Sequence, residues 1–381
     1  MRIMHIASFA GNLGDIINHN GFYDGLKKYI TNDIEIDQIE IRKFYNNSNQ
    51  QKFDIDLVHT INGYDALVIG GGGFFDVRWN NSHTGTTLDF TDDFIDEIKI
   101  PVILNLMGYH ESYDDDYSLA FNNFQRFIKK VSTKKNWFIS IRNDGSFKRM
   151  QKRFGCEFLT NILKYPDSGF YFSCNNDYVE RTNKIIGVNI SNDLFFNYFT
   201  NNVQTEKFNS DILEYIAYIL NKKYKLMFIA HTPKDIDLAY SLINKLNALD
   251  KRNNIIVAPY MPFDNYGAYE MKRYYEMCDL IVGMRFHSNI LSIAAKTPVI
   301  GLAGHEQIEA LYREIDMKDY CIRVGEENYI YKLIHKTDEI LKFSNEWYFL
   351  IKKLYSNLYV EQKEYINKIK EFLEDYKNEN R

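Results

Sequence analysis

Short apolar runs alternate along the chain with amphipathic segments, and this alternation predicts its fold. Continuous apolar runs are typical of strands buried on both faces of a parallel sheet, whereas amphipathic segments are typical of the helices that cover such a sheet. In the first half we predict strands over residues 2–7, 34–41, 66–69, 102–107 and 137–141. Helices are predicted over residues 16–29, 94–98, 117–131 and 145–154. This order of strands and helices indicates an α/β domain.

A second series of strands and helices follows a polar segment at residues 173–182. Its strands are predicted over residues 185–190, 225–230, 255–258, 279–283 and 299–302, and its helices over 211–221, 235–246, 268–277 and 288–296. We therefore expect an α/β protein with two Rossmann-like domains, residues 1–172 and 173–337, that face each other across a cleft. Residues 338–381 are charged and amphipathic, and we expect this helical segment to pack back across the two halves.

The composition and net charge bear on the class of protein and on its partners. A chain of 381 residues is long enough for two domains, and 45% hydrophobic with 25% charged residues is ordinary for a soluble globular protein. The net charge of −5 argues against a protein that binds nucleic acid through a basic face. We therefore expect no nucleic-acid partner.

Cysteine usage and hydropathy bear on location. Cys156, Cys174, Cys278 and Cys321 show no CxxC spacing, so they indicate neither a zinc site nor a disulfide framework, and four scattered thiols fit a reducing cytoplasm. The N-terminal apolar run is too short for a signal peptide, and no apolar stretch reaches about eighteen residues. We expect a cytoplasmic protein without an integral membrane segment, and a peripheral contact with the inner face of the membrane stays open.

The segment MRFHSNILSIAAKTPVIGL, residues 284–302, carries the strongest chemical signal. Arg285 and His287 follow a predicted buried strand and precede a predicted helix, whose N-terminus favours anions. In an extended chain, residues two apart point to the same side. A guanidinium fork beside an imidazole suits the binding and protonation of an anionic substrate. The alternative is a structural Arg285 paired to a core carboxylate, with His287 capping a turn.

Two glycine-rich turns follow strands of the first half. Residues 11–15, GNLGD, place backbone N–H groups where a ligand can approach, although a plain tight turn explains them equally well. Residues 70–76, GGGGFFD, place four glycines directly after a buried strand, which favours close approach of another group to the backbone. Asp76 is then positioned to activate or orient a substrate hydroxyl. A turn-forming role for Asp76 is the alternative.

Two further motifs also stand at strand ends. In SIRND, residues 140–144, Arg142 is a candidate second anion clamp, or else an arginine that ties two loops together. In HTPKD, residues 231–235, Thr232 and Pro233 predict a helix start, which leaves His231 at the carboxyl edge of the sheet.

Taken in order, these motifs resemble the polysaccharide pyruvyl transferase family. The resemblance runs from GNLGD through GGGGFFD, SIRND, YPDSGF (residues 165–170) and HTPKD to the segment at 284–302, and it covers about residues 1–325. It implies a GT-B-like fold and the transfer of pyruvate from phosphoenolpyruvate onto a sugar as a cyclic ketal. The expected partners are phosphoenolpyruvate as co-substrate and a glycan or lipid-linked sugar as acceptor, with no metal or other cofactor.

The resemblance implies functional roles for Asp76, Arg142, Arg285 and His287. His287 is the candidate general acid toward the donor methylene carbon, and Asp76 is the candidate base. The other expected donor-binding residues are Arg285, Arg142, His231 and Ser288. The expected acceptor-binding residues, on the side of the first domain, are Gly14, Asp15, Gly72, Gly73, Phe74 and Trp79.

One departure from the family pattern leaves the donor open. Members of the family often carry a lysine shortly after the strand that ends PVIGL, and here the corresponding run is Gly304 to Ile308, with Gln307 and no lysine. A GT-B glycosyltransferase that uses a nucleotide sugar is one alternative, in which Glu306 or Glu309 would hold a ribose. A non-catalytic glycan-binding relative is the other.

Overall fold

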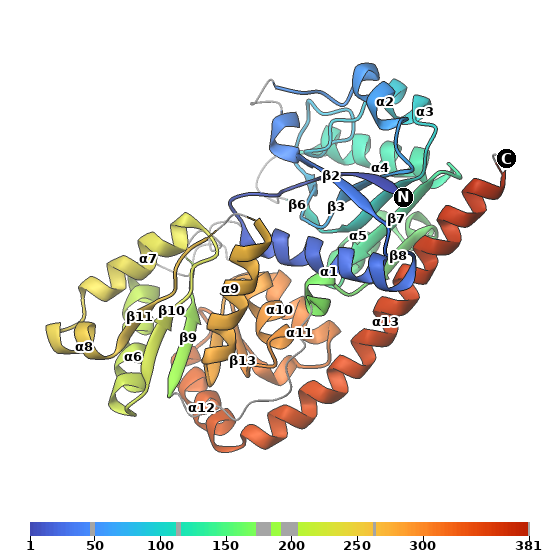
Figure 1. Cartoon of the computed structure of the whole chain (residues 1–381). Coiled ribbons are helices and arrows are strands. Elements are labelled where there is room, and N and C mark those ends of the chain that lie inside the picture. Colours follow the sequence, from blue (N-terminus) through green and yellow to red (C-terminus); the bar gives the residue numbers. More distant parts are fainter. Residues whose placement is uncertain (46–49, 112–115, 173–183, 192–204, 262–263, 380–381) are drawn as a thin grey trace. The chain divides into compact units, whose positions relative to one another are not determined.

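The computed structural model describes residues 1–45, 50–111, 116–172, 184–191, 205–261 and 264–379 (Figure 1). The chain divides into two compact units. Unit 1 comprises Met1–Phe9, Gly21–Ser168 and Tyr359–Arg381, and unit 2 comprises Ala10–Asn20 and Gly169–Leu358.

This division differs from the predicted domains in two ways. The break after the first half falls at Ser168 rather than at residue 172, and the short segment Ala10–Asn20 belongs to unit 2. Residues 338–381 are not a separate segment, because the long helix α13 (Ser344–Glu379) passes from unit 2 into unit 1 at Tyr359.

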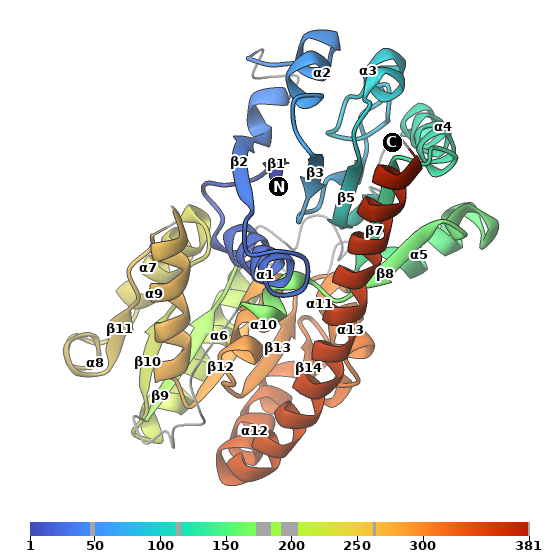
Figure 2. The same cartoon turned by 45° about the vertical axis from the view of Figure 1, so that its right-hand side comes forward.

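Unit 1 is built on a six-stranded parallel sheet in the order β2-β1-β3-β5-β7-β8 (Figures 1 and 2). Its strands are β1 (Arg2–Ala7), β2 (Glu35–Glu40), β3 (Ala66–Gly70), β5 (Val102–Met107), β7 (Trp137–Arg142) and β8 (Ile162–Tyr165). A separate parallel pair joins β4 (Phe75–Val77) to β6 (Tyr109–Glu111). Parallel neighbours bring the carboxyl ends of all six strands to one edge, and ligands of such sheets bind there.

Helices cover both faces of this sheet, as the continuous apolar strands require. Leu67 and Ile69 of β3 belong to the core beneath α2 (Ile55–Ile61), α3 (Asp92–Glu97) and α4 (Ser118–Ser132). Ala66 and Val68, which alternate with them, face the opposite core. That second core contains Phe22 of α1 (Leu13–Tyr29) and a group of residues from the C-terminal part of α13. Helix α5 (Ser146–Phe154) follows β7.

Unit 2 contains a second six-stranded parallel sheet, in the order β11-β10-β9-β12-β13-β14. Its strands are β9 (Ile185–Asn189), β10 (Lys225–Phe228), β11 (Ile255–Val257), β12 (Leu280–Gly283), β13 (Val299–Ala303) and β14 (Cys321–Arg323). Numbered from its own first strand, this is the 3-2-1-4-5-6 order of the Rossmann fold. The order reverses between β9 and β12, which places the ligand-binding crevice of this unit outside the ends of those two strands.

The helices of unit 2 divide between the two faces of the sheet. Helices α6 (Thr205–Asn221), α7 (Pro233–Asn244) and α12 (Tyr329–Lys342) share one core with β9, β10 and β12. The opposite core combines α9 (Asp264–Met277), α10 (Phe286–Ala294) and α11 (Glu306–Glu314) with Leu13, Ile16 and Ile17 of α1. These three apolar residues explain why the segment around them belongs to unit 2. A short helix, α8 (Ala248–Asn253), precedes β11.

Two Rossmann-like units therefore confirm the predicted α/β fold class. Within the described part of the chain, no helix is both long enough and apolar enough to cross a membrane.

Candidate active site

Arg285 lies at the predicted crevice of unit 2. It follows β12, and Asn189, the last residue of the neighbouring strand β9, accepts the backbone N–H of Arg285 at 3.0 Å through its side-chain oxygen. Arg285 itself is extended, with φ −81° and ψ 146°, and is the N-cap of α10. The helix begins at Phe286, two residues earlier than predicted. His287 is therefore helical, and the expectation that Arg285 and His287 share one side of an extended chain is wrong.

The Arg285 guanidinium is held by a buried carboxylate. Its Nε lies 2.8 and 2.9 Å from the two oxygens of Asp235, and its Nη2 lies 2.6 Å from one of them. Nη2 also donates to the hydroxyls of Thr232, at 2.8 Å, and Ser191, at 3.1 Å. The pairing to a core carboxylate is thus confirmed. These partners follow two neighbouring strands, β9 and β10, and together they fix the plane of the guanidinium at the crevice.

Asp235 joins the HTPKD motif to Arg285. It belongs to a capping box with Thr232 at the start of α7, and its carboxylate accepts the backbone N–H groups of His231 at 2.9 Å and Thr232 at 3.2 Å. Sequence analysis gave Asp235 no role, although the Thr-Pro-Lys-Asp spacing is a capping signal. One carboxylate therefore both caps the helix and orients the arginine.

His287 packs against the first turn of α1, at Gly14. A Cβ added to Gly14 would lie 2.2 Å from Nδ1 of His287 and 2.5 Å from its Cβ, so only glycine fits there. His287 is 7% exposed. Gly14 therefore lies beside the candidate general acid within unit 2, and not on an acceptor side formed by the first half. Asp15, the next residue, is half-buried in the same segment.

His231 is fully buried and cannot contact a ligand as predicted. Burial, followed by the charges of Arg285 and His287, lowers its pKa to about 3. Its Nε2 lies 2.8 Å from the Tyr275 hydroxyl, which in turn donates to Ser288 Oγ at 2.8 Å. Because the tyrosine proton goes to Ser288, Nε2 of His231 carries a proton and donates. Ser288 is also fully buried, so its predicted contact with the donor through its side chain is wrong as well.

A second constellation lies at the carboxyl edge of unit 1. A Cβ on Gly108 would lie 2.7 Å from Nη2 of Arg142, and one on Gly73 would lie 3.0 Å from Nε2 of His110. The glycines after β3 and β5 therefore make room for an arginine and a histidine. His110 was not singled out from the sequence, and its position just beyond an apolar strand was the available signal.

Arg142 is buried between two buried carboxylates. Its Nε donates to Asp144 at 2.8 Å, and its Nη1 lies 3.6 Å from Asp167, in the loop after β8. Burial would raise the pKa of Asp144, but the charges of Arg142 and Arg149 prevail and hold it well below its usual range. The loop-tying alternative is thus observed for Arg142, and its role as an anion clamp stays a prediction.

Asp76 lies on β4, where it is the register partner of His110 on β6. Its carboxylate pairs with Nε of Arg78 at 2.8 Å, and its side chain is 19% exposed. Burial raises the pKa of Asp76, and the Arg78 charge opposes this effect. Asp76 and His110 thus stand side by side next to the Gly73 turn.

The family model for polysaccharide pyruvyl transferases matches residues 12–306, most of the chain. The chain belongs to the polysaccharide pyruvyl transferase family. It is accordingly a transferase, as predicted. No curated protein matches it.

Solved structures similar to this chain agree on the fold. The UDP-GlcNAc 2-epimerase from Methanocaldococcus jannaschii aligns with a TM-score of 0.51 at 15% identity, over 89% of this chain and 92% of the epimerase. The S. aureus MnaA structure with UDP aligns with a TM-score of 0.50 at 11% identity, over 92% of this chain and 90% of MnaA. At these identities the likeness concerns the fold alone, and it supports the GT-B-like pair of Rossmann units.

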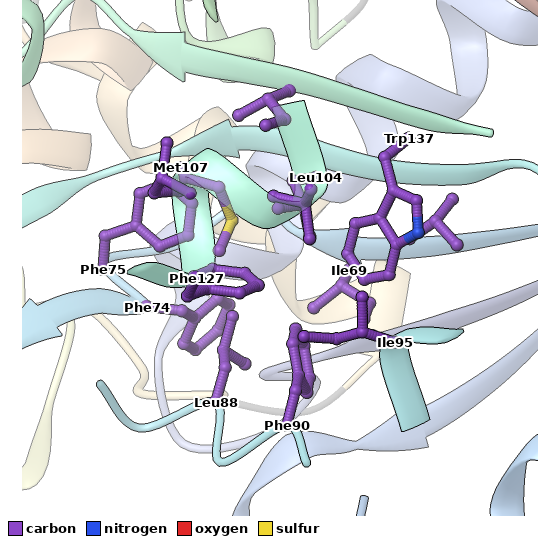
Figure 3. Close-up of a cluster of buried hydrophobic side chains, with 14 of the residues drawn as sticks. Ile69, Phe74, Phe75, Leu88, Phe90, Ile95, Leu104, Met107, Phe127 and Trp137 are labelled. Atoms are coloured by element: carbon purple, nitrogen blue, oxygen red, sulfur yellow. The ribbon is translucent and has the colours of Figure 1, made fainter. Parts of the chain in front are cut away.

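The two aromatic residues expected to bind the acceptor, Phe74 and Trp79, differ in burial. Figure 3 shows Phe74 and Phe75 of the pyruvyl transferase among the buried side chains of Leu88, Phe90 and Met107. Phe74 is 6% exposed and packs against Gly72, whose added Cβ would lie 2.9 Å from its ring. Phe74 therefore belongs to the core, and its assignment to the acceptor is wrong. Trp79 is half-buried and stays a candidate.

The segment that departs from the family pattern forms the start of α11. His305 is the N-cap of that helix and is 4% exposed, and Gln307 lies in its first turn. No group of three or more His, Cys, Asp or Glu that could hold a metal occurs among the described residues of the pyruvyl transferase. Among the described residues, Cys156, Cys278 and Cys321 form no disulfide, and Cys174 lies outside the described residues.

Proposed function

We propose that the protein transfers the pyruvyl group of phosphoenolpyruvate to two hydroxyls of a glycan or lipid-linked sugar, forming a cyclic ketal. The observation that carries this proposal is the fixed guanidinium of Arg285 beside His287, at the switch point of a Rossmann-like unit. Phosphoenolpyruvate presents a phosphate and a carboxylate, and an oriented guanidinium at a helix N-terminus suits either group. A held arginine also loses less conformational entropy when the donor binds.

The proposed chemistry begins with a proton. His287 gives a proton to the methylene carbon of phosphoenolpyruvate, which becomes the methyl group and leaves C2 electron-poor. A sugar hydroxyl attacks C2, and a second hydroxyl closes the ring as inorganic phosphate leaves with the C2–O bond electrons. One hydroxyl proton restores His287 and the other departs through a base or with the phosphate. This sequence needs no metal or redox cofactor, because protonation itself supplies the electrophile.

We assign the acceptor-side base to Asp76. Its raised pKa and its place beside His110 and Gly73 suit a carboxylate that receives a hydroxyl proton near neutral pH. Gly72, Gly73 and Trp79 remain the candidate acceptor contacts in unit 1, and Arg142 the candidate second anion contact. The reducing cytoplasm, with or without peripheral attachment to the membrane, is the proposed location.

Calorimetry with phosphoenolpyruvate tests the donor assignment. Arg285→Lys keeps a cation beside the buried Asp235 and should still remove most donor binding, because a point charge cannot reproduce the planar fork. Arg285→Ala should remove measurable binding, and a thermal melt verifies that the loss of the Asp235 cation has not unfolded unit 2. His287→Gln should bind the donor and release no phosphate. Arg273→Ala, on α9 of the same unit, removes an exposed arginine paired to Glu270 and should behave like the wild type. Wild-type donor binding by Arg285→Ala, or binding of a UDP-sugar in place of phosphoenolpyruvate, would overturn the proposal.

Arg142 needs a gentler substitution than alanine. Its removal would leave Asp144 and Asp167 buried without their cation, which typically costs about 3–5 kcal/mol of stability. Loss of activity in Arg142→Ala would therefore say little about substrate. Arg142→Lys keeps a cation between Asp144 and Asp167 but removes the guanidinium fork, so it should weaken donor binding without unfolding unit 1.

A further inference from the structure

Unit 2 contains a cavity of about 280 Å³ that the proposed transfer reaction does not use. It lies between helix α7 and the carboxyl ends of β9, β10 and β11. Its walls are formed by Val188 of β9, Ile190 just after that strand, Phe228 of β10, and Ala239 and Ile243 of α7. The walls come from four elements of one compact unit, so the cavity is a built feature of that unit.

The side chains of the cavity are almost entirely apolar. Asp235 is the one charged side chain in its wall, and its oxygens are already bonded to Arg285 and to the backbone of His231 and Thr232. A sugar or a nucleobase needs hydrogen-bond partners that these side chains do not supply, and burying its polar groups without them is costly. An apolar ligand group incurs no such cost.

Apolar surface continues from the cavity to the outside of the unit. Ile236, Tyr240 and Val257 line the cavity and are 38%, 66% and 58% exposed. These three residues extend the apolar lining to the exposed mouth of the cavity. A ligand could therefore enter along an apolar path.

We propose that this cavity binds an aliphatic chain. A volume near 280 Å³ corresponds to about nine waters, or to roughly ten methylene-sized groups. The shared wall at Asp235 places the chain next to Arg285, so a molecule that carries the chain would have its other end close to the candidate active site. Two sources supply such a chain, namely the lipid of a lipid-linked acceptor and the lipids of a bilayer. The inference does not depend on phosphoenolpyruvate as donor.

Calorimetry with n-decyl glucoside, below the concentration at which it forms micelles, tests the cavity directly. The wild type should bind it with a negative heat-capacity change, and glucose should not bind. Ala239→Phe fills the cavity and should weaken binding by about 10-fold or more. Tyr266→Ala removes an exposed aromatic residue of α9 that does not line the cavity, and it should leave the affinity unchanged.

A rim variant protects the test against misfolding of Ala239→Phe. Tyr240→Asp places a charge on an exposed position at the mouth and should also weaken decyl glucoside by about 10-fold. Wild-type affinity in both variants would overturn the proposal. Flotation with phosphatidylcholine vesicles then shows which of the two sources, the bilayer or the lipid-linked acceptor, supplies the aliphatic chain. If vesicles carry the wild type but not Tyr240→Asp, the chain comes from the bilayer. If they carry neither, the chain arrives with the acceptor.

Discussion

At the scale of single residues, the site depends on groups that hold other groups in place. Asp235 fixes Arg285, and Tyr275 links His231 to Ser288 within the core. Neither Asp235 nor Tyr275 was assigned from the sequence, because a buried polar contact depends on which strand ends become neighbours. His231 illustrates the difficulty. Its place after a strand resembles that of a ligand-binding histidine, but its side chain turns into the core instead.

The raised pKa of Asp76 predicts the acid side of the activity profile. A carboxylate base works when it is ionised, so activity should fall as pH drops through the pKa of Asp76, which lies above the ordinary value of 3.8. Arg78 lowers that pKa, and Arg78→Ala should therefore move the acid limb of kcat/KM to higher pH. Arg126→Ala, which affects an exposed arginine near Asp92, is the control. If Arg78→Ala leaves the acid limb of kcat/KM at the same pH as in the wild type, Asp76 is not the base.

The lowered pKa of His231 predicts a loss of stability in acid. Its folded pKa is about 3 and its unfolded value is 6.5, so the unfolded chain binds the proton more readily between these limits. The contribution of His231 to the free energy of unfolding is therefore fully present above pH 6.5, and it falls by about 1.4 kcal/mol for each pH unit below that value. His231→Gln should therefore lose roughly 2 kcal/mol less than the wild type between pH 7 and pH 5, as measured by urea unfolding. His59→Gln, an exposed replacement, should lose as much as the wild type.

At the scale of elements, the strands were easier to predict than the turns that hold the candidate site residues. The strand Val102–Met107 matches its prediction because five of its six residues are apolar and all six are buried. The strands β4, β6, β8 and β14 are three or four residues long, too short for a pattern to emerge, and they were missed. The sequence pointed to the two glycine turns, residues 11–15 and 70–76, but not to the side chains that pack against them. Gly14 contacts His287 through a packing of α1 against α10 that no local pattern encodes.

The contact between Gly14 and His287 predicts a large effect from a single methyl group. Gly14→Ala must push the imidazole aside by about an ångström, and a misplacement of that size can cost about 100-fold in turnover. Gly63→Ala, in an exposed turn of unit 1, is the control, because Gly63 does not have a left-handed φ and the nearest atom to its added Cβ is the Thr60 carbonyl oxygen at 3.3 Å. Phosphate release measures turnover, and a thermal melt verifies folding. Full activity in Gly14→Ala would remove His287 from the reaction.

At the scale of the whole molecule, each unit is assembled from segments far apart in the sequence. Tyr365, Ile366 and Ile369 of α13 are buried in the second core of unit 1. The Tyr365 hydroxyl bonds to Ser140 of β7 at 2.9 Å. Composition and periodicity predicted two units, but they could not show that the final helix completes the first unit, since its apolar stripe would suit any exposed sheet face.

Truncation of Tyr365 should therefore destabilise unit 1. Tyr365→Ala leaves a cavity and removes the bond to Ser140, at a cost of about 3 kcal/mol or more in the free energy of unfolding. Tyr359→Ala, on the same helix but 45% exposed, should cost less than about 1 kcal/mol. Urea titration compares the two variants. Equal, small losses would mean that the C-terminal part of α13 contributes little to the core.

The division of α13 also sets an order of events during synthesis. Unit 2 needs residues 10–20 and 169–358, all of which have left the ribosome before Tyr359 emerges. Unit 1 needs residues 359–379 as well, so the half that is translated first is the half that is completed last. Until then the apolar face around Val68 and Ile103 lacks its cover on the nascent chain. That face is where a chaperone would be expected to bind while translation continues.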